Sequence, residues 1–196
     1  QELEEKTPPN HIGTIIFQAK GQIENIPIVE LGKAFTLSFD DLNANETYYY
    51  YSIQHANADW TISELFKSEY IRGFDDVRIR NMSNSSATLQ SYTNYALTIP
   101  NRNTEIIASG NYVLSVFDGK QKLIFRKRFV VYEQLANVDV GVFRLRDLEG
   151  IDNQQRIEIG VQTANINSRQ PNQDISVWAL QNYRWSSARK IPKYDY

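Results

Sequence analysis

Residues 110–132, GNYVLSVFDGKQKLIFRKRFVVY, decide the fold class. Apolar and polar side chains alternate in much of this stretch, and a two-residue period is the signature of a β-strand. The pair Asp118-Gly119 divides it, and Asp-Gly between two such runs predicts a β-hairpin. The first half is apolar on both faces, which favours a central strand. In the second half Phe125 and Phe129 share one face and basic residues share the other, which is typical of an antiparallel strand with one wet side.

The same alternation extends toward the N-terminus, as in GTIIFQA at residues 13–19. Further strands are expected over residues 26–31, 34–39, 47–55, 77–80 and 87–99. About eight strands at this spacing are typical of a β-sandwich. We therefore predict an all-β protein. A flexible leader, residues 1–12, is expected to precede an immunoglobulin-like or fibronectin-like antiparallel β-sandwich over residues 13–133.

The alternation restarts after Glu133, with Val138, Val140 and Val142 separated by Asp139 and Gly141. The remaining stretch is short for an independent sandwich, which usually needs about 100 residues. It still carries aromatic residues when the sequence stops. We expect residues 138–196 to be the beginning of a second, incomplete β-rich domain in a longer natural protein.

The composition excludes several classes of protein. Of the 196 residues 41% are hydrophobic and 22% are charged, which is ordinary for a globular chain with a buried core. The net charge of −2 argues against a nucleic-acid partner, because binding phosphates requires an excess of basic residues. No apolar run approaches the roughly 20 residues of a membrane-spanning helix, so the chain is not expected to span a membrane. Without cysteine, thiol catalysis and thiolate metal sites are excluded.

The segment YYYYSIQHANADWTISELFKSEYIRGF, residues 48–74, opens on four tyrosines. On a strand, Tyr48 and Tyr50 face one side, and Tyr49 and Tyr51 face the other. Tyrosine suits a half-buried pleated surface, so we interpret this strand as a central one with both faces covered. A ladder of exposed rings that stacks on sugars is the alternative.

A long connection, residues 57–76, follows the tyrosines and is rich in aromatic side chains. Within it, Thr61-Ile62-Ser63-Glu64 fits the capping box of a helix and predicts one or two helical turns. Long ordered loops usually carry function or pack over the core. We therefore expect this aromatic loop to form a satellite core, a partner-contacting surface, or both.

The sequence predicts no catalytic residue, cofactor or metal site. The only histidines are His11, in the polar leader, and His55, at the end of the tyrosine strand with Asp59 nearby. Three or four zinc ligands are not available from two distant histidines and no cysteine. The adjacent carboxylates Asp40-Asp41 and Asp75-Asp76 would point to opposite faces of a strand, so we interpret them as turn and cap residues. We therefore expect the protein to be non-enzymatic and to have no small-molecule substrate.

The stretch YYYYSIQHANADWTISELFKSEYIRGFDD, residues 48–76, resembles the signature of the N-terminal domain of the type 9 secretion system plug proteins of Bacteroidota, formerly a domain of unknown function. Other fitting pieces are Tyr92-Thr93-Asn94-Tyr95 with Leu97 and Pro100, Ser109-Gly110-Asn111-Tyr112, Arg128-Phe129, and Gln181-Asn182 with Arg184-Trp185. The resemblance spans most of the chain from about residue 12. Many members carry cysteine after the histidine, where this chain has Ala56.

The resemblance implies a periplasmic protein at the inner face of the outer membrane. Such a protein binds the outer-membrane β-barrel translocon and seals its pore, which needs no catalytic residue. Candidate contact residues come from the aromatic loop and from the basic edge of the hairpin: Trp60, Phe66, Tyr70, Phe74, Lys122, Arg126 and Arg128.

Two other functions remain open at this point. A carbohydrate-binding module would expose two or three of Tyr48, Tyr50, Trp60 and Trp178 in one plane. An accessory domain of a larger secreted enzyme would leave the chemistry to a domain beyond Tyr196. The start at Gln1 rather than methionine fits either removal of a signal peptide or an engineered start.

Overall fold

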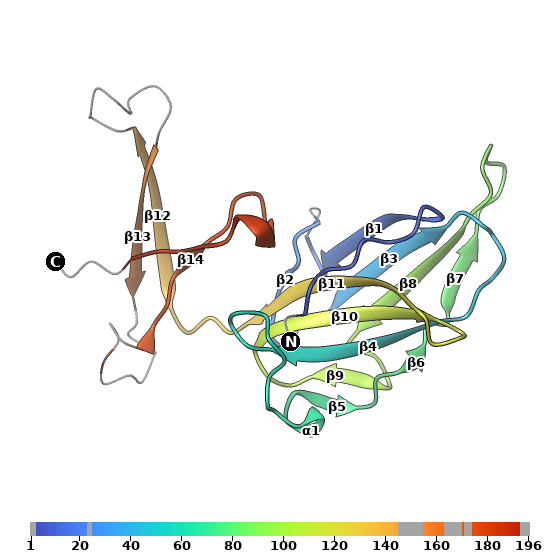
Figure 1. Cartoon of the computed structure of the whole chain (residues 1–196), viewed down its shortest axis with the longest axis horizontal. Helices are drawn as coiled ribbons and strands as arrows, with labels where there is room; N and C mark the ends of the chain where they lie inside the picture. The colour runs from blue at the N-terminus through green and yellow to red at the C-terminus, as the bar shows by residue number, and fades with distance from the viewer. Residues whose placement is uncertain (1–2, 23–24, 145–154, 163–169, 171–173, 193–196) are drawn as a thin grey trace. The chain divides into compact units, whose positions relative to one another are not determined.

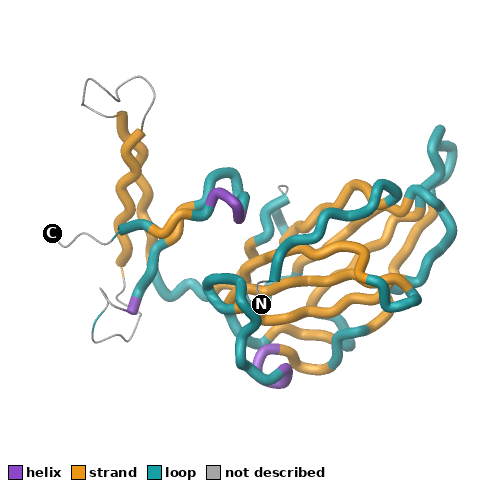
Figure 2. Tube along the Cα trace, viewed as in Figure 1, coloured by secondary structure: helices purple, strands orange, loops and turns teal. Residues whose placement is uncertain are grey.

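The structure is a computed structural model that describes residues 3–22, 25–144, 155–162, 170 and 174–192. The chain divides into two compact units, residues 1–133 and 134–196. Strands dominate the parts that are described, and the helical segments there are short (Figures 1 and 2).

The first unit is a sandwich of two sheets (Figure 1). The four-stranded sheet has the order β1 (Ile12–Ala19), β3 (Phe35–Asp41), β8 (Thr93–Ile99) and β7 (Asn81–Asn84). The five-stranded sheet has the order β2 (Ile28–Glu30), β11 (Leu123–Tyr132), β10 (Gly110–Asp118), β4 (Tyr49–Ala56) and β6 (Val77–Arg78). A separate two-stranded sheet pairs β5 (Ile71–Gly73) with β9 (Thr104–Ile106).

This architecture confirms the predicted all-β sandwich. The hairpin of β10 and β11 is antiparallel, with Tyr112 opposite Phe129. β10 is central, between β11 and β4, as its two apolar faces indicated.

Aromatic rings from the two sheets fill the core. Phe35 of β3 and Phe129 of β11 lie with ring centroids 5.1 Å apart. Phe39 of β3 meets Tyr49 of β4 edge-to-face at 5.2 Å. Such ring pairs contribute roughly 0.5–1.5 kcal/mol beyond the area they bury. Tyr49 and Tyr51 therefore face the core, whereas Tyr48 on the other face is exposed, so only one face of the tyrosine strand is fully covered.

The N-terminal segment expected to be a flexible leader lies against the five-stranded sheet in its described part. Leu3 is buried with Ala56 and Val113 on the outer face of that sheet, and Trp60 packs against them. Lys6 forms a β-bridge with Arg126 on the outer edge of β11. Farther along that edge, β2 pairs in parallel with β11, Ile28 opposite Val130. The sequence of the leader is polar, and the β11 edge supplies the partners that keep it in place.

The second unit contains the antiparallel pair β12 (Asn137–Arg144) and β13 (Gln155–Gln162), and the short pair β14 (Trp178–Ala179) and β15 (Arg189–Lys190). Val140 of β12 stands opposite Ile159 of β13, and Val142 opposite Ile157. Val138, Val140, Val142 and Ile157 are all exposed. A one-turn 3-10 helix, Trp185–Ser187, precedes β15.

Candidate functional site

The loop 57–76, which joins β4 to β6, carries four of the seven candidate contact residues, and the structure gives them different settings. Phe66 is 78% exposed and Phe74 is 76% exposed. Tyr70 belongs to the hydrophobic core, and Trp60 is half-buried. Two of the four rings are therefore available on the surface for a partner.

Hydrogen bonds fix the beginning of the loop. The amide of Trp60 donates to the Asn57 carbonyl at 2.9 Å, and the Trp60 carbonyl accepts from the amide of Leu3 at 2.8 Å. Trp60 has a φ of +65°, a conformation that is uncommon for a bulky residue. The guanidinium of Arg128 lies 4.7 Å from the centroid of the Trp60 ring. Leader, loop and β11 thus converge on one tryptophan.

The predicted helix is displaced along the loop. Asp59 accepts hydrogen bonds from both the amide and the hydroxyl of Thr61, at 3.0 and 2.6 Å, so Thr61 does not cap a helix. The helix α1 (Lys67–Tyr70) begins later. There the Glu69 carboxylate accepts from the amide of Phe66 at 2.7 Å. The prediction at Thr61-Ile62-Ser63-Glu64 was wrong because Asp59 forms a competing local turn.

Tyr70 ends α1 and points into the sandwich. Its ring centroid lies 5.5 Å from that of His55 and 6.0 Å from that of Tyr112. Ile71, the next residue, is buried and pairs with Ile106 across β5 and β9. This packing makes the middle of the loop part of the main core and ties it to β4 and β10, so the core beneath this part of the loop is not a separate satellite.

Asp75 closes the base of the loop. Its Oδ2 atom accepts from the Ile53 amide of β4 at 2.7 Å and from the Lys67 ammonium at 2.5 Å. Because Lys67 follows Phe66 and Asp75 follows Phe74, this ion pair ties together the two chain positions next to the exposed rings. Lys67 also donates to the Ile53 carbonyl at 2.9 Å. Neither Lys67 nor Asp75 is predicted from sequence as a loop anchor, and the only signal is the acidic pair Asp75-Asp76.

The end of the loop packs against β9 and the turn before it. The amide of Phe74 donates to the carbonyl of Asn103 at 2.7 Å, and the Thr104 hydroxyl donates to the carbonyl of Phe74. In Figure 1, α1, β5 and β9 lie close to β4 and β6 of the five-stranded sheet. The backbone on either side of the Phe74 side chain is therefore held while its ring faces solvent.

The three candidate contact residues of the basic edge have different surroundings and do not form one surface group. Arg128 is engaged within the chain, because its Nε donates to the Leu3 carbonyl at 2.7 Å in addition to its contact with Trp60. Arg126 is half-buried beside Lys6. Lys122 is exposed in the β10–β11 turn and lines a cavity that lies away from loop 57–76.

Within the first unit, the aromatic residues expected of a carbohydrate platform are not brought together. Tyr48 precedes β4 and Trp60 follows it, so a strand of eight residues separates them, roughly 26 Å. The guanidinium of Arg78 covers the Tyr48 ring at 3.5 Å. Tyr50 is half-buried, and Trp178 belongs to the second unit.

His55 and Asp59 do not form a catalytic pair. The imidazole lies between Tyr70 and Tyr112, and burial lowers the pKa of His55 below its ordinary value. Asp59 is on the surface, where its hydrogen bonds with Thr61 lower the pKa of the carboxyl. In the described residues, no group of three or more His, Asp or Glu side chains is placed to hold a metal ion. Nor is any helix there long and apolar enough to cross a membrane.

The fold and the loop define a β-sandwich module that presents two phenylalanine rings on a hydrogen-bonded loop. The family model described as "Type 9 secretion system plug protein 1st domain" matches residues 12–133, more than half of the chain. The chain belongs to this family, which confirms the resemblance read from residues 48–76. Membership supports a role in type 9 secretion and fits a location in the periplasm or cell envelope.

A solved structure has the same fold: the crystal structure of a hypothetical protein from Parabacteroides merdae ATCC 43184. The two chains are 28% identical, with a TM-score of 0.86. The alignment covers 97% of this chain and 49% of the other, so this chain spans about half the length of that protein. No curated protein matches the chain.

Proposed function

We propose that the protein is a non-enzymatic periplasmic plug. It binds the β-barrel translocon of the type 9 secretion system at the inner face of the outer membrane and seals the pore. Family membership supports this role. A plug needs a rigid body with a complementary surface, and the double-layered core meets the first requirement.

The proposed contact surface rests on one observation. Phe66 and Phe74 are exposed on a loop that is held in place by contacts within the chain. Large aromatic side chains are enriched among residues that dominate binding energies at protein interfaces. Because the Lys67–Asp75 ion pair and the Phe74–Asn103 hydrogen bond order the backbone in the free protein, binding would cost little additional ordering. Tyr70 and Trp60 support the loop from beneath rather than touching the partner.

The first test is a pull-down of the tagged full-length protein from its native host, with the outer membrane solubilised in detergent. Mass spectrometry should identify a very large β-barrel translocon component. Phe66→Ser and Phe74→Ser should each reduce its recovery. Leu89→Ser is the matched control, because Leu89 is fully exposed on the loop between β7 and β8 and lies outside the proposed surface.

Sealing requires a separate measurement. In a planar lipid bilayer that holds the purified translocon, adding the protein should lower the ionic current, and Phe74→Ser should lower it less. Recovery of no membrane protein, together with retention on a glycan array, would overturn the plug assignment in favour of sugar binding. If both phenylalanine variants recover the barrel as well as the unchanged protein does, the loop is not part of the interface.

A further inference from the structure

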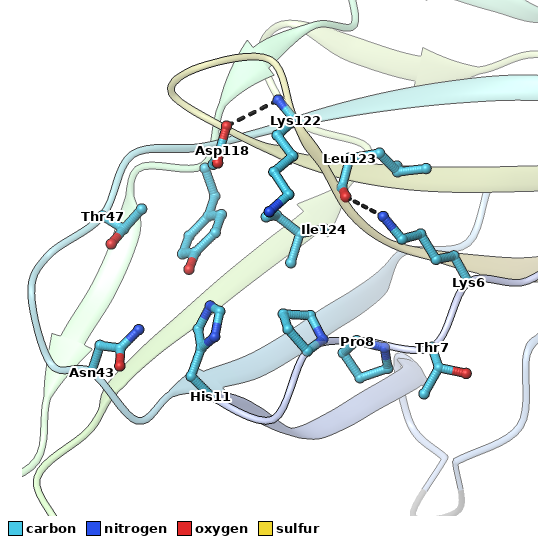
Figure 3. Close-up of a pocket in the computed structure, with 12 residues that line it drawn as sticks. Lys6, Thr7, Pro8, His11, Asn43, Thr47, Asp118, Lys122, Leu123 and Ile124 are labelled. Carbon is cyan, nitrogen blue, oxygen red and sulfur yellow. Dashed lines mark hydrogen bonds between the residues drawn. The ribbon is translucent and has the colours of Figure 1, made fainter.

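A cavity of about 420 Å³ lies where three segments distant in the sequence meet, away from loop 57–76 (Figure 3). The leader forms one wall, the connection between β3 and β4 a second, and the β10–β11 turn a third. Cavities of about 300–1,000 Å³ are the usual size of small-ligand sites. Nothing in the proposed plug role uses this one.

Hydrogen bonds hold the walls together. Lys6 of the leader donates through Nζ to the Leu123 carbonyl at 2.5 Å, and its own carbonyl accepts from the amide of Arg126 at 3.2 Å. The His11 carbonyl accepts from the amide of Leu42 at 2.8 Å, which joins the leader to the second wall. The cavity is therefore formed before any ligand arrives.

Several polar side chains line the cavity, among them those of Thr7, Asn43 and Thr47. The ammonium of Lys122 and the imidazole of His11, which also line it, have no hydrogen-bond partner among the described residues. Figure 3 shows them on opposite walls, with Lys122 descending from the turn and His11 rising from the leader. The acidic group nearest to Lys122 along the chain is Asp118. Its Oδ1 accepts from the backbone amides of Lys120 and Lys122, at 2.9 and 3.0 Å, and forms no ion pair with the Lys122 ammonium.

The rest of the lining is mixed: Lys6, Thr7, Asn43, Thr47, Tyr49 and Asp118 are polar, and Pro8, Pro9, Leu123 and Ile124 are apolar. Pro8, Pro9 and Ile124 give the cavity an apolar wall. The hydroxyl of Tyr49, which also lines the cavity, donates its proton to Asp41 at 2.9 Å and therefore does not offer it to a ligand. An ammonium beside an apolar wall is complementary to an anionic oxygen attached to a compact apolar group.

We propose that this cavity is a binding site for a small organic carboxylate that carries a compact apolar group. The carboxylate accepts hydrogen bonds from the Lys122 ammonium and from a ring nitrogen of His11. The apolar group packs on Pro8 and Ile124. The inference does not depend on the plug role, since neither Phe66 nor Phe74 lines the cavity.

The probe is N-acetyl-leucine, titrated into the ¹⁵N-labelled full chain at constant ionic strength. Two compounds separate the two parts of the ligand: N-acetyl-leucinamide keeps the apolar group without the charge, and acetate keeps the charge without the apolar group. We expect saturable shifts of the Lys122 and Ile124 amide signals with N-acetyl-leucine, at a Kd of about 1 mM, and much weaker ones with the other two.

Lys122→Gln should weaken the binding of N-acetyl-leucine by about tenfold, the usual scale for one charge-assisted hydrogen bond. Lys120→Gln is the matched control, because it removes the same charge from the same turn but from outside the cavity. An otherwise unchanged spectrum shows that both variants are folded. The proposal is overturned if no saturable shift occurs, if the amide binds as tightly as the acid, or if Lys120→Gln weakens binding as much as Lys122→Gln.

Discussion

The hydroxyl of Tyr49 donates a 2.9 Å hydrogen bond to Oδ2 of Asp41, and both side chains are buried. Tyr49 belongs to β4 and Asp41 to β3, so the bond joins the two layers of the sandwich. The other carboxyl oxygen accepts from the amide of Asn43 at 3.0 Å. Burial, and then the Asp41 carboxylate, raise the pKa of Tyr49. The hydroxyl thus stays protonated and keeps its role as a donor.

Tyr49→Phe should destabilise the protein, because it leaves a buried carboxylate oxygen without its side-chain donor. The free energy of unfolding should fall by about 1.5–3 kcal/mol, the range for hydrogen bonds to charged groups. Urea unfolding followed by circular dichroism measures it. Tyr48→Phe is the control, since Tyr48 is exposed and should change stability by less than about 0.5 kcal/mol. Equal losses in the two variants would contradict the role of the Asp41 bond.

Asp75→Asn should loosen the base of loop 57–76. The substitution removes the charge that pairs with Lys67 and weakens an acceptor shared by Ser52, Ile53 and Lys67. We expect a loss of about 2 kcal/mol and faster hydrogen exchange at the Ile53 amide. Asp76→Asn is the neighbouring control, because Asp76 is exposed and asparagine tolerates its φ of +65°. Unchanged exchange at Ile53 would show that Asp75 does not hold the loop.

Gly73→Ala should disrupt the pairing of β5 with β9. Gly73 has a φ of +93°, and a Cβ atom there would lie 2.1 Å from the carbonyl oxygen of Asn103, which is backbone and cannot swing aside. Strain of this kind costs about 1–3 kcal/mol. Thermal unfolding should therefore occur at a lower temperature than in the control Gly119→Ala, where the new Cβ meets only ordinary contacts. Matching Tm values would mean that the turn relaxes freely.

The free energy of unfolding should decrease as the pH falls below about 6.5, the ordinary pKa of histidine. Burial lowers the pKa of His55 in the folded state, and a hydrogen bond with the Ser109 backbone opposes this only in part. Below pH 6.5 the unfolded chain therefore binds a proton more readily than the folded one, and the stabilisation that exists above pH 6.5 is progressively lost. Urea unfolding at a series of pH values measures the slope.

His55→Gln should flatten the slope just below pH 6.5, where carboxyl groups contribute little. His11→Gln, the same change at the other histidine, is the control. A slope that persists in His55→Gln would assign the pH dependence to other groups.

The strand pattern was predictable from sequence wherever alternation and turn chemistry agreed. The hairpin at Asp118-Gly119 was predicted correctly because both signals coincide there. β7 was missed: residues 81–84 have no apolar alternation, and they form a strand because β8 offers them a pairing edge. A pairing edge also decides where β8 begins. The strand was expected over 87–99 but begins only at Thr93, because its partner β3 ends at Asp41, opposite Thr93.

Exposure within the aromatic loop could not be predicted. Phe66, Tyr70 and Phe74 are all aromatic, and hydrophobicity alone would favour burial of a phenylalanine, but the helix α1 turns only Tyr70 toward His55 and Tyr112. Which ring is buried depends on the exact path of the loop back across β4 and on its contact with β10, which lies far from the loop in sequence. The cavity around Lys122 was missed for a similar reason, because three distant segments build it.

The pairing of β2 and Lys6 with the outer edge of β11 has a consequence for the order of folding. Residues near the start of the module find their partners only about 100 residues later, and contacts of such long sequence separation slow folding. Until β11 is in place, β2 has nothing to pair with, and β10 presents an open edge of the kind that recruits strands from other chains. The edge of β10 thus stays open until β11, the last strand of the module, pairs with it. β11 then joins the N-terminal part of the module to its C-terminal part.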